Sequence, residues 1–426
     1  MGARHRILGN DAMTKQDTGP QEGQTEGDRT LWELVPVADY RLPEMPAAHA
    51  AQARWVSLKR LFAGPRHDNE APARTEAALS RLPAQRLDAL VASVNWGPGA
   101  KVLQRELAEG GSDDAVRFLI GPPRSGHVEL LRRWATEQGA HWIEPPKYDD
   151  ILEVGPAWLA GWPSDAHCWV LTRLEHCWLR HPAGLALVRE LLDRALSGRL
   201  GHGVIGCDSW AWAYLRYVAP LPTPSALTLQ AFDGKRLAAL FRHLVAVEAP
   251  AQFHFCDAQT GKRVLTVDGE DNDDGSAELQ SLAAHCRGNA GLARELWRAR
   301  LRDEPKSEPG TDKDTADQDA KPAADGHDDD KAVWVSAPAE EPALAADGEE
   351  EPALVLHALL LHNGLPGGRL AEVLPLPPFR VQGTLHRLAG AGLVAAAPTG
   401  HWHITAAGYP WARGLLQAQD LLLDDF

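Results

Sequence analysis

The sequence predicts an α/β protein in which a five-stranded parallel sheet carries a helical lid and is followed by an acidic linker and a small C-terminal domain. Three features predict it. Short apolar runs alternate with helical stretches between residues 116 and 229, acidic residues crowd the segment 303–352, and helix and hairpin signals follow that segment. The chain has 426 residues, more than the roughly 250 to 300 at which single cores stop growing, so several domains are expected.

Six segments are expected along the chain. They are a disordered tail at 1–30, a helical N-terminal region at 31–112, the α/β core at 113–230, the helical lid at 231–302, the disordered acidic linker at 303–352 and the C-terminal domain at 353–426. The tail is polar and has no periodicity. In the N-terminal region, leucines recur at near-helical spacing between 76 and 94, which predicts a helix there.

Five apolar runs supply the strands of the predicted sheet. They lie at 116–120, 141–143, 168–171, 203–207 and 226–229. Helical stretches separate them, and strands that alternate with helices are typical of parallel βαβ units. In the lid, helical patterns at 232–245 and 277–301 enclose a hairpin at 253–267, which turns at Thr260 and Gly261.

The charge of the chain is concentrated in its linker. The formal net charge is −15, and the segment 303–352 alone holds 17 acidic residues and four lysines. No basic block indicates non-specific nucleic-acid binding. The apolar residues 332–335, which include Trp334, interrupt the linker; they are either an added strand of a folded domain or exposed by chance.

Cysteine usage and hydropathy indicate a cytoplasmic protein. The five cysteines are widely spaced and form no CxxC pair, which fits free thiols in a reducing compartment. We expect no signal sequence and no integral membrane segment. Metal sites at 268–275 or around Cys168, His176 and Cys177 are conceivable, but a solvated turn and buried core residues are favoured, so no metal site is predicted.

The order of elements in the C-terminal domain is typical of a winged helix. Helical spacing at 356–360, 370–374 and 381–388 is followed by a strand at 392–394, a turn at Thr399 and Gly400, and a returning strand at 401–405. A DNA-binding winged helix would turn its third helix to a groove. Here that helix offers Arg380, Gln382, Thr384, His386 and Arg387. Because four arginines between 354 and 426 are balanced by four acidic residues, protein docking is favoured over DNA binding.

The residues after the first strand predict a phosphate-binding loop that lacks its chemical groups. The loop and helix start read Gly121, Pro122, Pro123, Arg124, Ser125, Gly126, His127 and Val128. Gly121 and Gly126 have the spacing of GxxxxGK[ST], whose backbone amides and helix N-terminus surround a phosphate. However, His127 replaces the lysine and Val128 replaces the magnesium-binding hydroxyl. Arg124 is the alternative cation.

Two further strand ends depart from a nucleotide-hydrolysing pattern. The third strand runs into Thr172 where an acidic residue would hold magnesium. Glu175 is either a displaced water-activating base or a structural carboxylate. The fourth strand ends at Asp208, which would repel a γ-phosphate.

From 116 onward the chain resembles the AAA+ and STAND superfamily of P-loop ATPases, in the branch with a winged helix after the lid. The loop at 121–131, the strand end at 169–175 and the segment 288–293 carry the resemblance. The chain also resembles bacterial proteins labelled only as ATP-binding. The resemblance implies an ATP or ADP site, with a lid arginine, Arg287 or Arg294, contacting the nucleotide.

The departures at His127, Val128 and Thr172 predict a non-hydrolysing pseudo-ATPase that acts through protein partners and has no firm magnesium site. Two alternatives stay open: a nucleotide-dependent switch with weak ATPase activity, and a DNA-binding transcriptional regulator. The oligomeric state and the identity of the partner are not indicated by the sequence.

Overall fold

The computed structural model describes residues 31–44, 79–109, 114–152, 157–163, 168–219, 225–245, 253–267, 276–303, 331–338 and 350–426. The predicted tail at 1–30, most of the acidic linker and the acidic turn at 268–275 lie outside these residues.

The central sheet has six strands in the order β1-β7-β3-β6-β5-β4. Its strands are β1 (Leu34–Pro36), β3 (Val116–Gly121), β4 (His141–Ile143), β5 (Trp169–Leu171), β6 (Gly203–Asp208) and β7 (Ala226–Leu229). The five predicted strands are parallel to one another. The sixth, β1, pairs antiparallel with β7, so the sheet is mixed and the N-terminal region is not purely helical. Burial of Leu34 beside Leu229 explains why β1 covers this edge.

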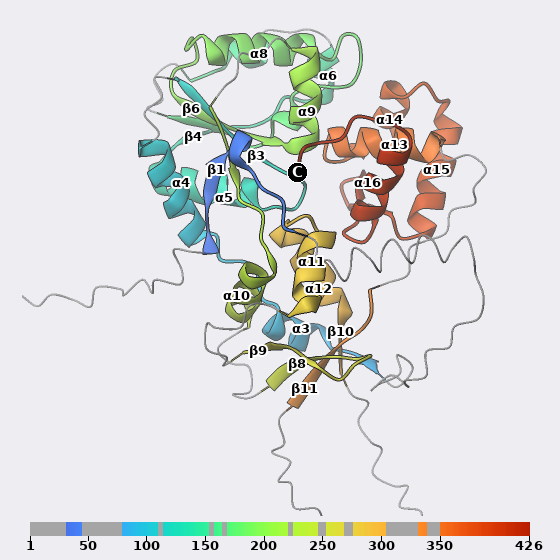
Figure 1. Ribbon diagram of the computed structural model, residues 1–426. Coiled ribbons are helices and arrows are strands. Elements are labelled where there is room, and N and C mark those ends of the chain that lie inside the picture. The colour runs from blue at the N-terminus through green and yellow to red at the C-terminus, as the bar shows by residue number, and fades with distance from the viewer. Residues whose placement is uncertain are drawn as a thin grey trace, which may run out of the picture.

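Helices cover both faces of this sheet (Figure 1). They include α4 (Gly97–Glu109), α5 (His127–Gln138), α8 (Ala186–Leu196) and α9 (Ser209–Val218). Alternate residues of β3 point to opposite faces, because side chains alternate along a strand. Leu119 joins the cluster formed with α4 and α5, whereas Phe118 and Ile120 join the cluster that contains Trp210 of α9. The short helices α6 (Tyr148–Leu152), α7 (Ala157–Ala160) and η3 (Leu174–His176) lie in the connections.

The lid contains a second sheet in addition to its predicted helices. The helices are α10 (Gly234–Leu244), α11 (Ala277–His285) and α12 (Ala290–Arg300). Arg287 and Gly288, both with positive φ, separate α11 from α12, which the sequence suggested as one helix. The predicted hairpin is the antiparallel pair β8 (Phe253–Asp257) and β9 (Arg263–Thr266). The predicted hairpin is therefore present, as part of a larger sheet that the sequence did not predict.

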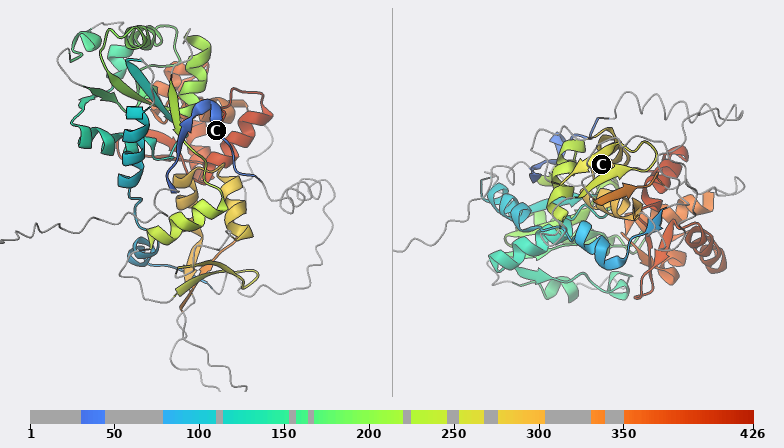
Figure 2. Two further views of the ribbon diagram at one scale, coloured as in Figure 1. Left: turned by 60° about the vertical axis from the view of Figure 1, so that its left-hand side comes forward. Right: turned by 90° about the horizontal axis from the view of Figure 1, so that it is seen from below.

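The second sheet has the order β2-β10-β11-β8-β9 and lies at the far end of the molecule from α8 (Figures 1 and 2). It includes β2 (Ser80–Arg81) and β10 (Leu301–Asp303), and α3 (Ala84–Leu90) follows β2. The apolar residues of the linker form β11 (Lys331–Val335), parallel to β8 and antiparallel to β10. The added-strand alternative is the one found. Val333 and Val335 are buried on one side, while Trp334 packs with Cys256 on the other.

The C-terminal domain has the three predicted helices and the predicted hairpin, together with a short strand and a last helix that the sequence did not predict. Its elements are α13 (Glu350–Leu361), β12 (Leu365–Pro366), α14 (Gly367–Val373), α15 (Pro378–Gly390), β13 (Val394–Ala396), β14 (His401–Ile404) and α16 (Gly408–Ala418). The three strands pair in the order β12-β14-β13. We call the β13–β14 hairpin the wing. Because α13 packs on α14, α15 and α16 and also on α9 of the core, it is buried along nearly its whole length.

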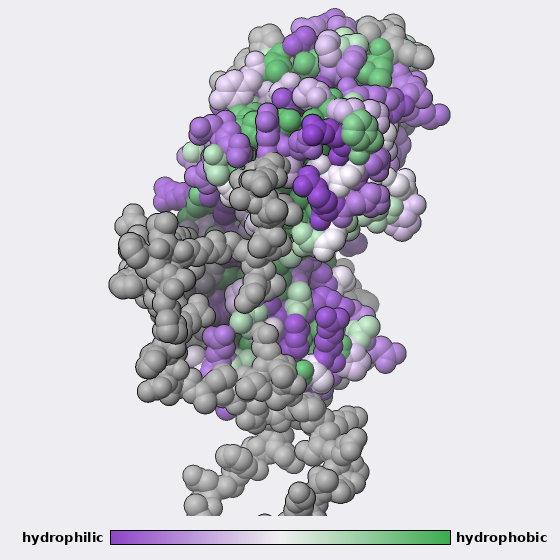
Figure 3. Space-filling model, turned by 90° about the vertical axis from the view of Figure 1, so that its right-hand side faces the viewer, coloured by the Kyte–Doolittle hydropathy of each residue, from purple (hydrophilic) through white to green (hydrophobic). Residues whose placement is uncertain are grey.

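The exposed surface is mixed in character. On the face shown in Figure 3, hydrophobic residues are scattered among hydrophilic ones wherever grey residues do not cover the surface. Among the described residues, none of the helices combines the length and apolar character needed to cross a bilayer.

Candidate functional site

The β3–α5 loop is filled from inside by two of its own side chains. Ser125 Oγ lies 3.0 Å from His127 Nδ1. A Cβ atom added to Gly121 would lie 2.4 Å from Ser125 Oγ and 2.8 Å from His127 Nδ1. Only glycine fits there. The Ser125 hydroxyl and the His127 imidazole are therefore packed against the glycine that begins the loop.

His127 supplies no positive charge to the loop. His127 is 4% exposed. Burial, assisted by the nearby Arg173 guanidinium, lowers the pKa of His127 to about 3. The imidazole is thus neutral at physiological pH, and its Nε2 atom is buried without a hydrogen-bond partner. This geometry differs from that of an extended lysine reaching a phosphate.

The neighbouring positions add no magnesium ligand. Val128 is buried at the first turn of α5. Thr172 is buried just after β5. Its carbonyl oxygen packs closely on Gly206, so that a Cβ atom added to this glycine would lie only 2.5 Å from it.

Arg124, the alternative cation, is bound to other parts of the protein. It adopts a left-handed backbone conformation with φ of 70°. Its Nη1 atom lies 2.6 Å from both carboxylate oxygens of Glu295 in α12, and its Nη2 atom donates to the Ile404 carbonyl of the wing at 2.9 Å. The guanidinium therefore joins the loop to the lid and to the C-terminal domain.

The start of α12 lies directly against the loop. Asn289 Nδ2 donates to the Pro123 carbonyl at 2.7 Å, and Asn289 also caps α12. A Cβ on Gly291 would lie 1.8 Å from the Arg124 carbonyl oxygen, so the two backbones are in close contact. Pro122 and Pro123 are both buried. Sequence reasoning placed this lid segment near the nucleotide but did not predict contact this close.

The lid arginines are engaged elsewhere. Arg294 donates to the carbonyls of Val91 and Ala92 at 3.1 and 2.8 Å. Burial, followed by the charge of Arg298, lowers the pKa of Arg294. Arg287 donates to the Phe426 carbonyl at 2.5 Å. The structure thus ties one arginine to the N-terminal region and the other to the C-terminal domain.

Sequence reasoning missed Trp96, which covers the loop. A Cβ on Gly126, whose φ is 86°, would lie 1.9 Å from the Trp96 ring. Trp96 is itself held by Trp32, at 5.1 Å between ring centroids. No sequence motif marks Trp96 for this position.

The loop, the lid and the C-terminal domain enclose a cavity of about 630 Å³, within the range of small-molecule sites. We call it the loop cavity. Its polar and charged lining includes Ser93, Arg124, His127, Glu129, Arg173, Arg294, Glu295, Asn363, His403 and Tyr409.

Two carboxyls are buried together at the ends of β5 and β6. Glu175 and Asp208 have no exposed surface, and the Asp208 backbone N–H donates to Glu175 Oε2 at 3.1 Å. Each retains one carboxyl oxygen without a partner. Burial raises the pKa of both carboxyls, and the charge of Glu175 raises that of Asp208 further. Both carboxyls therefore keep their protons to a higher pH than free carboxyls do.

The C-terminal domain reaches this carboxyl pair. Asn363 lies at the turn between α13 and β12 and has φ of 45°. Burial raises the pKa of Glu175, and a hydrogen bond from the Asn363 side chain opposes part of this rise. His362 Nε2 accepts from the Arg180 backbone N–H at 3.3 Å. The place at which a catalytic carboxylate would meet water is thus covered by this domain.

Four of the five predicted recognition residues on α15 are exposed. Thr384 is the exception, at 1% exposure, because it shares the buried helix face with Val381, Leu385 and Leu388. Its prediction as a surface residue is wrong. Arg380 pairs with Glu351 at 2.8 Å, Arg387 donates to Thr384 at 3.3 Å, His386 lies against Trp402, and Gln382 lies against Gly367.

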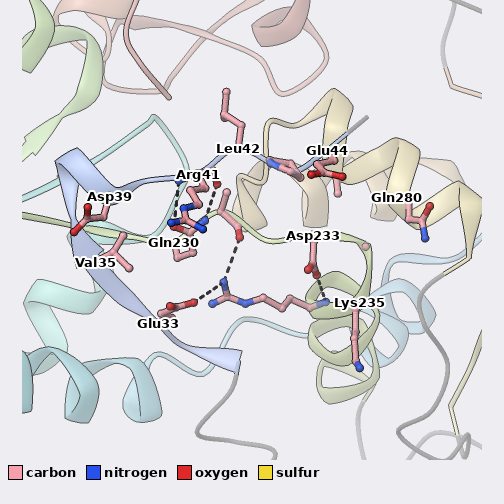
Figure 4. Close-up of a pocket in the computed structure, with 15 residues that line it drawn as sticks. Glu33, Val35, Asp39, Arg41, Leu42, Glu44, Gln230, Asp233, Lys235 and Gln280 are labelled. Carbon is pink, nitrogen blue, oxygen red and sulfur yellow. Dashed lines mark hydrogen bonds and ion pairs between the residues drawn. The ribbon is translucent and has the colours of Figure 1, made fainter. Parts of the chain in front are cut away.

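A larger cavity, of about 1190 Å³, lies between the N-terminal segment and the lid (Figure 4). Within it Arg236 donates to the Leu31 and Ala231 carbonyls and pairs with Glu33. Gln230 exchanges two hydrogen bonds with the Arg41 backbone. These hydrogen bonds hold the N-terminal segment, although Arg236 Nε is left without a partner, and none of the predicted nucleotide-binding residues lines this cavity. We therefore place the candidate site at the loop cavity.

Metal chemistry has no support from the part of the chain that is described. No group of three or more His, Cys, Asp or Glu side chains there is arranged to hold a metal ion. The five cysteines are free, and four of them are buried.

Comparisons with known proteins give distant structural matches. No family model matches the sequence, and a search of curated proteins finds no match. Among solved structures, the chain is similar to the ORC2 protein of Aeropyrum pernix in complexes with ADPNP and ADP, at 13% identity and a TM-score of 0.27, covering 83% of this chain and 97% of the other. It is also similar to a Walker-type ATPase of Pyrococcus abyssi, at 11% identity and a TM-score of 0.26, covering 82% and 99%.

Proposed function

We propose that this chain is a P-loop ATPase-like protein that does not hydrolyse nucleotide and acts as a regulatory or scaffold protein through protein contacts. The observation that carries the proposal is the β3–α5 loop itself. Its interior holds the Ser125 hydroxyl and a neutral His127, and its arginine is bound to Glu295 and Ile404. A triphosphate would meet neither a free cation nor a metal-binding hydroxyl from the loop.

The strand ends support the same proposal. A hydrolysing site needs a carboxylate that accepts a proton from water. Glu175 is buried beside Asp208, and burial raises the pKa of both carboxyls. A carboxyl whose pKa is raised is ionised, and so able to accept a proton, in a smaller fraction of molecules than a free carboxyl. We therefore assign Glu175 and Asp208 a structural role.

The C-terminal domain supports protein contact better than DNA binding. Two of its α15 cations already have partners, Arg380 with Glu351 and Arg387 with Thr384. The wing, which could contact a DNA backbone, instead faces the core through His401 and Ile404. Fewer cations are left for phosphates than a DNA-binding surface requires.

Titration calorimetry with ATP, in magnesium and in EDTA, tests this proposal. We expect the wild type to bind weakly or not at all, with no difference between the two conditions. The double variant His127→Lys/Val128→Thr supplies both missing groups and should bind at least about tenfold more tightly in magnesium than in EDTA, a difference of about 1.4 kcal/mol. Micromolar binding by the wild type that is lost in EDTA would refute the proposal.

A further inference from the structure

We propose that Arg124 is a clasp that holds the lid and the wing closed over the loop cavity, and that a phosphate-bearing anion entering the cavity would release them by competing for its guanidinium. The inference goes beyond the proposed function, because it concerns the movement of two domains and requires no hydrolysis.

The geometry places three separate segments on one side chain. Arg124 leaves the β3–α5 loop, meets Glu295 of α12 through Nη1 and meets the Ile404 carbonyl of β14 through Nη2. The two partners lie 171 and 280 residues further along the chain. All three residues line the loop cavity. Loss of this one guanidinium therefore loosens two contacts between domains at once.

The surroundings of the clasp explain why it holds this position. The left-handed backbone of Arg124 is fixed by Gly291, which touches its carbonyl oxygen, and by Asn289, which binds the preceding carbonyl. The side chains of Arg124 and Glu295 are 29% and 39% exposed. A pair this exposed is weak by itself. It gains strength from the additional charge-assisted bond to Ile404.

Other contacts also join the C-terminal domain to the rest of the protein, and one of them, from Arg287 to the Phe426 carbonyl, reaches the lid. His401 Nε2 lies 3.2 Å from the Tyr148 hydroxyl, and Arg369 of α14 binds Asp149 of the same short helix. These contacts keep the C-terminal domain attached when the clasp opens. Opening should therefore loosen the wing and α12 without detaching the domain.

The clasp faces the space that an anion would enter. A guanidinium forms similar charge-assisted hydrogen bonds to phosphate oxygens and to carboxylate oxygens. Arg173 and Arg294 line the same cavity and would add attraction for an anion. An anion that takes the N–H groups of Nη1 and Nη2 now bonded to Glu295 and Ile404 displaces those partners. Anion binding and wing docking are then mutually opposed.

Hydrogen–deuterium exchange of the full chain tests the clasp. In Arg124→Gln we expect amides of 394–404 and 290–300 to exchange at least about tenfold faster, equivalent to about 1.4 kcal/mol of local opening free energy. Glutamine leaves the left-handed backbone position occupied by another non-glycine residue. Arg133→Gln is the matched control, because it breaks the exposed pair with Glu137 in α5 and should leave both segments unchanged.

A second variant and a ligand arm complete the experiment. Glu295→Gln should loosen 290–300 even if Arg124→Gln folds poorly. Pyrophosphate, as the probe, should accelerate exchange of the wing in the wild type and have no further effect in Arg124→Gln. Unchanged exchange in both clasp variants would overturn the clasp, and wild-type exchange that is unaffected or slowed by saturating pyrophosphate would overturn the competition.

Discussion

The substitution Asp424→Ala should lower the free energy of unfolding by about 3 to 5 kcal/mol, because it leaves a buried arginine unpaired. The side chain of Asp424 has no exposed surface, and that of Arg413 is 11% exposed. Asp424 accepts hydrogen bonds from Arg413 and from the Ser209 hydroxyl of α9. Arg413 and Asp424 both belong to the C-terminal domain, and the bond from Ser209 joins this pair to the core, next to the Trp210 Nε1 bond to the Tyr409 hydroxyl at 3.1 Å.

The neighbouring residue provides the control for this substitution. Asp425 is 82% exposed and lies 3.7 Å from Arg216, itself 56% exposed. An exposed pair of this kind contributes about 0 to 1 kcal/mol. Chemical denaturation gives the free energy of unfolding of Asp424→Ala and of Asp425→Ala, which are the same substitution at adjacent positions. Equal losses in Asp424→Ala and Asp425→Ala would show that the buried pair does not hold the two domains together.

The contribution of Glu175 and Asp208 to stability should fall as the pH rises above roughly pH 4, because these buried carboxyls keep protons that the unfolded chain releases. Burial raises the pKa of both carboxyls in the folded state, with Asp208 raised further by Glu175 and by Asp424. Arg173 opposes the shift in both, and Asn363 opposes it in Glu175. In the unfolded chain both titrate near roughly pH 4. Below that pH both states are protonated, and above it folding must retain protons, so stability is lost until the pH passes the folded pKa.

The double variant Glu175→Gln/Asp208→Asn should remove this loss. Relative to the wild type, its free energy of unfolding should rise by about 1.4 kcal/mol per pH unit for each proton that the wild type retains, from roughly pH 5 up to the folded pKa of the pair. Comparing the two proteins cancels the opposite effect of buried histidines such as His127 and His362, whose pKa falls to about 3. Glu190→Gln, in an exposed pair with Arg194, is the control. Parallel pH profiles for the double variant and the wild type would show that both carboxyls are ionised in the folded state.

The sequence predicted the parts of the fold that depend on local pattern. The five parallel strands, the β8–β9 hairpin and helix α9 follow from hydrophobic periodicity and turn residues. It did not predict β1, which has three residues and whose stability comes from pairing with β7. It left β11 undecided for the same reason: only β8 and β10, both distant in sequence, make it a strand.

For the site, the sequence showed which phosphate-binding groups are missing, but it did not show how the residues in their places are bonded. His127 and Val128 are visible as departures from a spacing pattern. The bonding partners of Arg124 could not be predicted from the sequence, because Glu295 and Ile404 lie far along the chain. The same holds for Glu175, whose raised pKa depends on burial beside Asp208. Thr384 was misplaced because residue type alone suggested a polar surface, whereas helical position places it inside.

Release of inorganic phosphate from ATP by the purified full chain, in the presence of magnesium, tests the central claim most directly. The neutral His127 in place of a loop lysine, together with the buried strand-end carboxyls, whose pKa is raised, predicts no release above that of a heat-denatured sample. It also predicts no difference between the wild type and folded Glu175→Gln. Sustained release over many turnovers that disappears in Glu175→Gln would contradict the account.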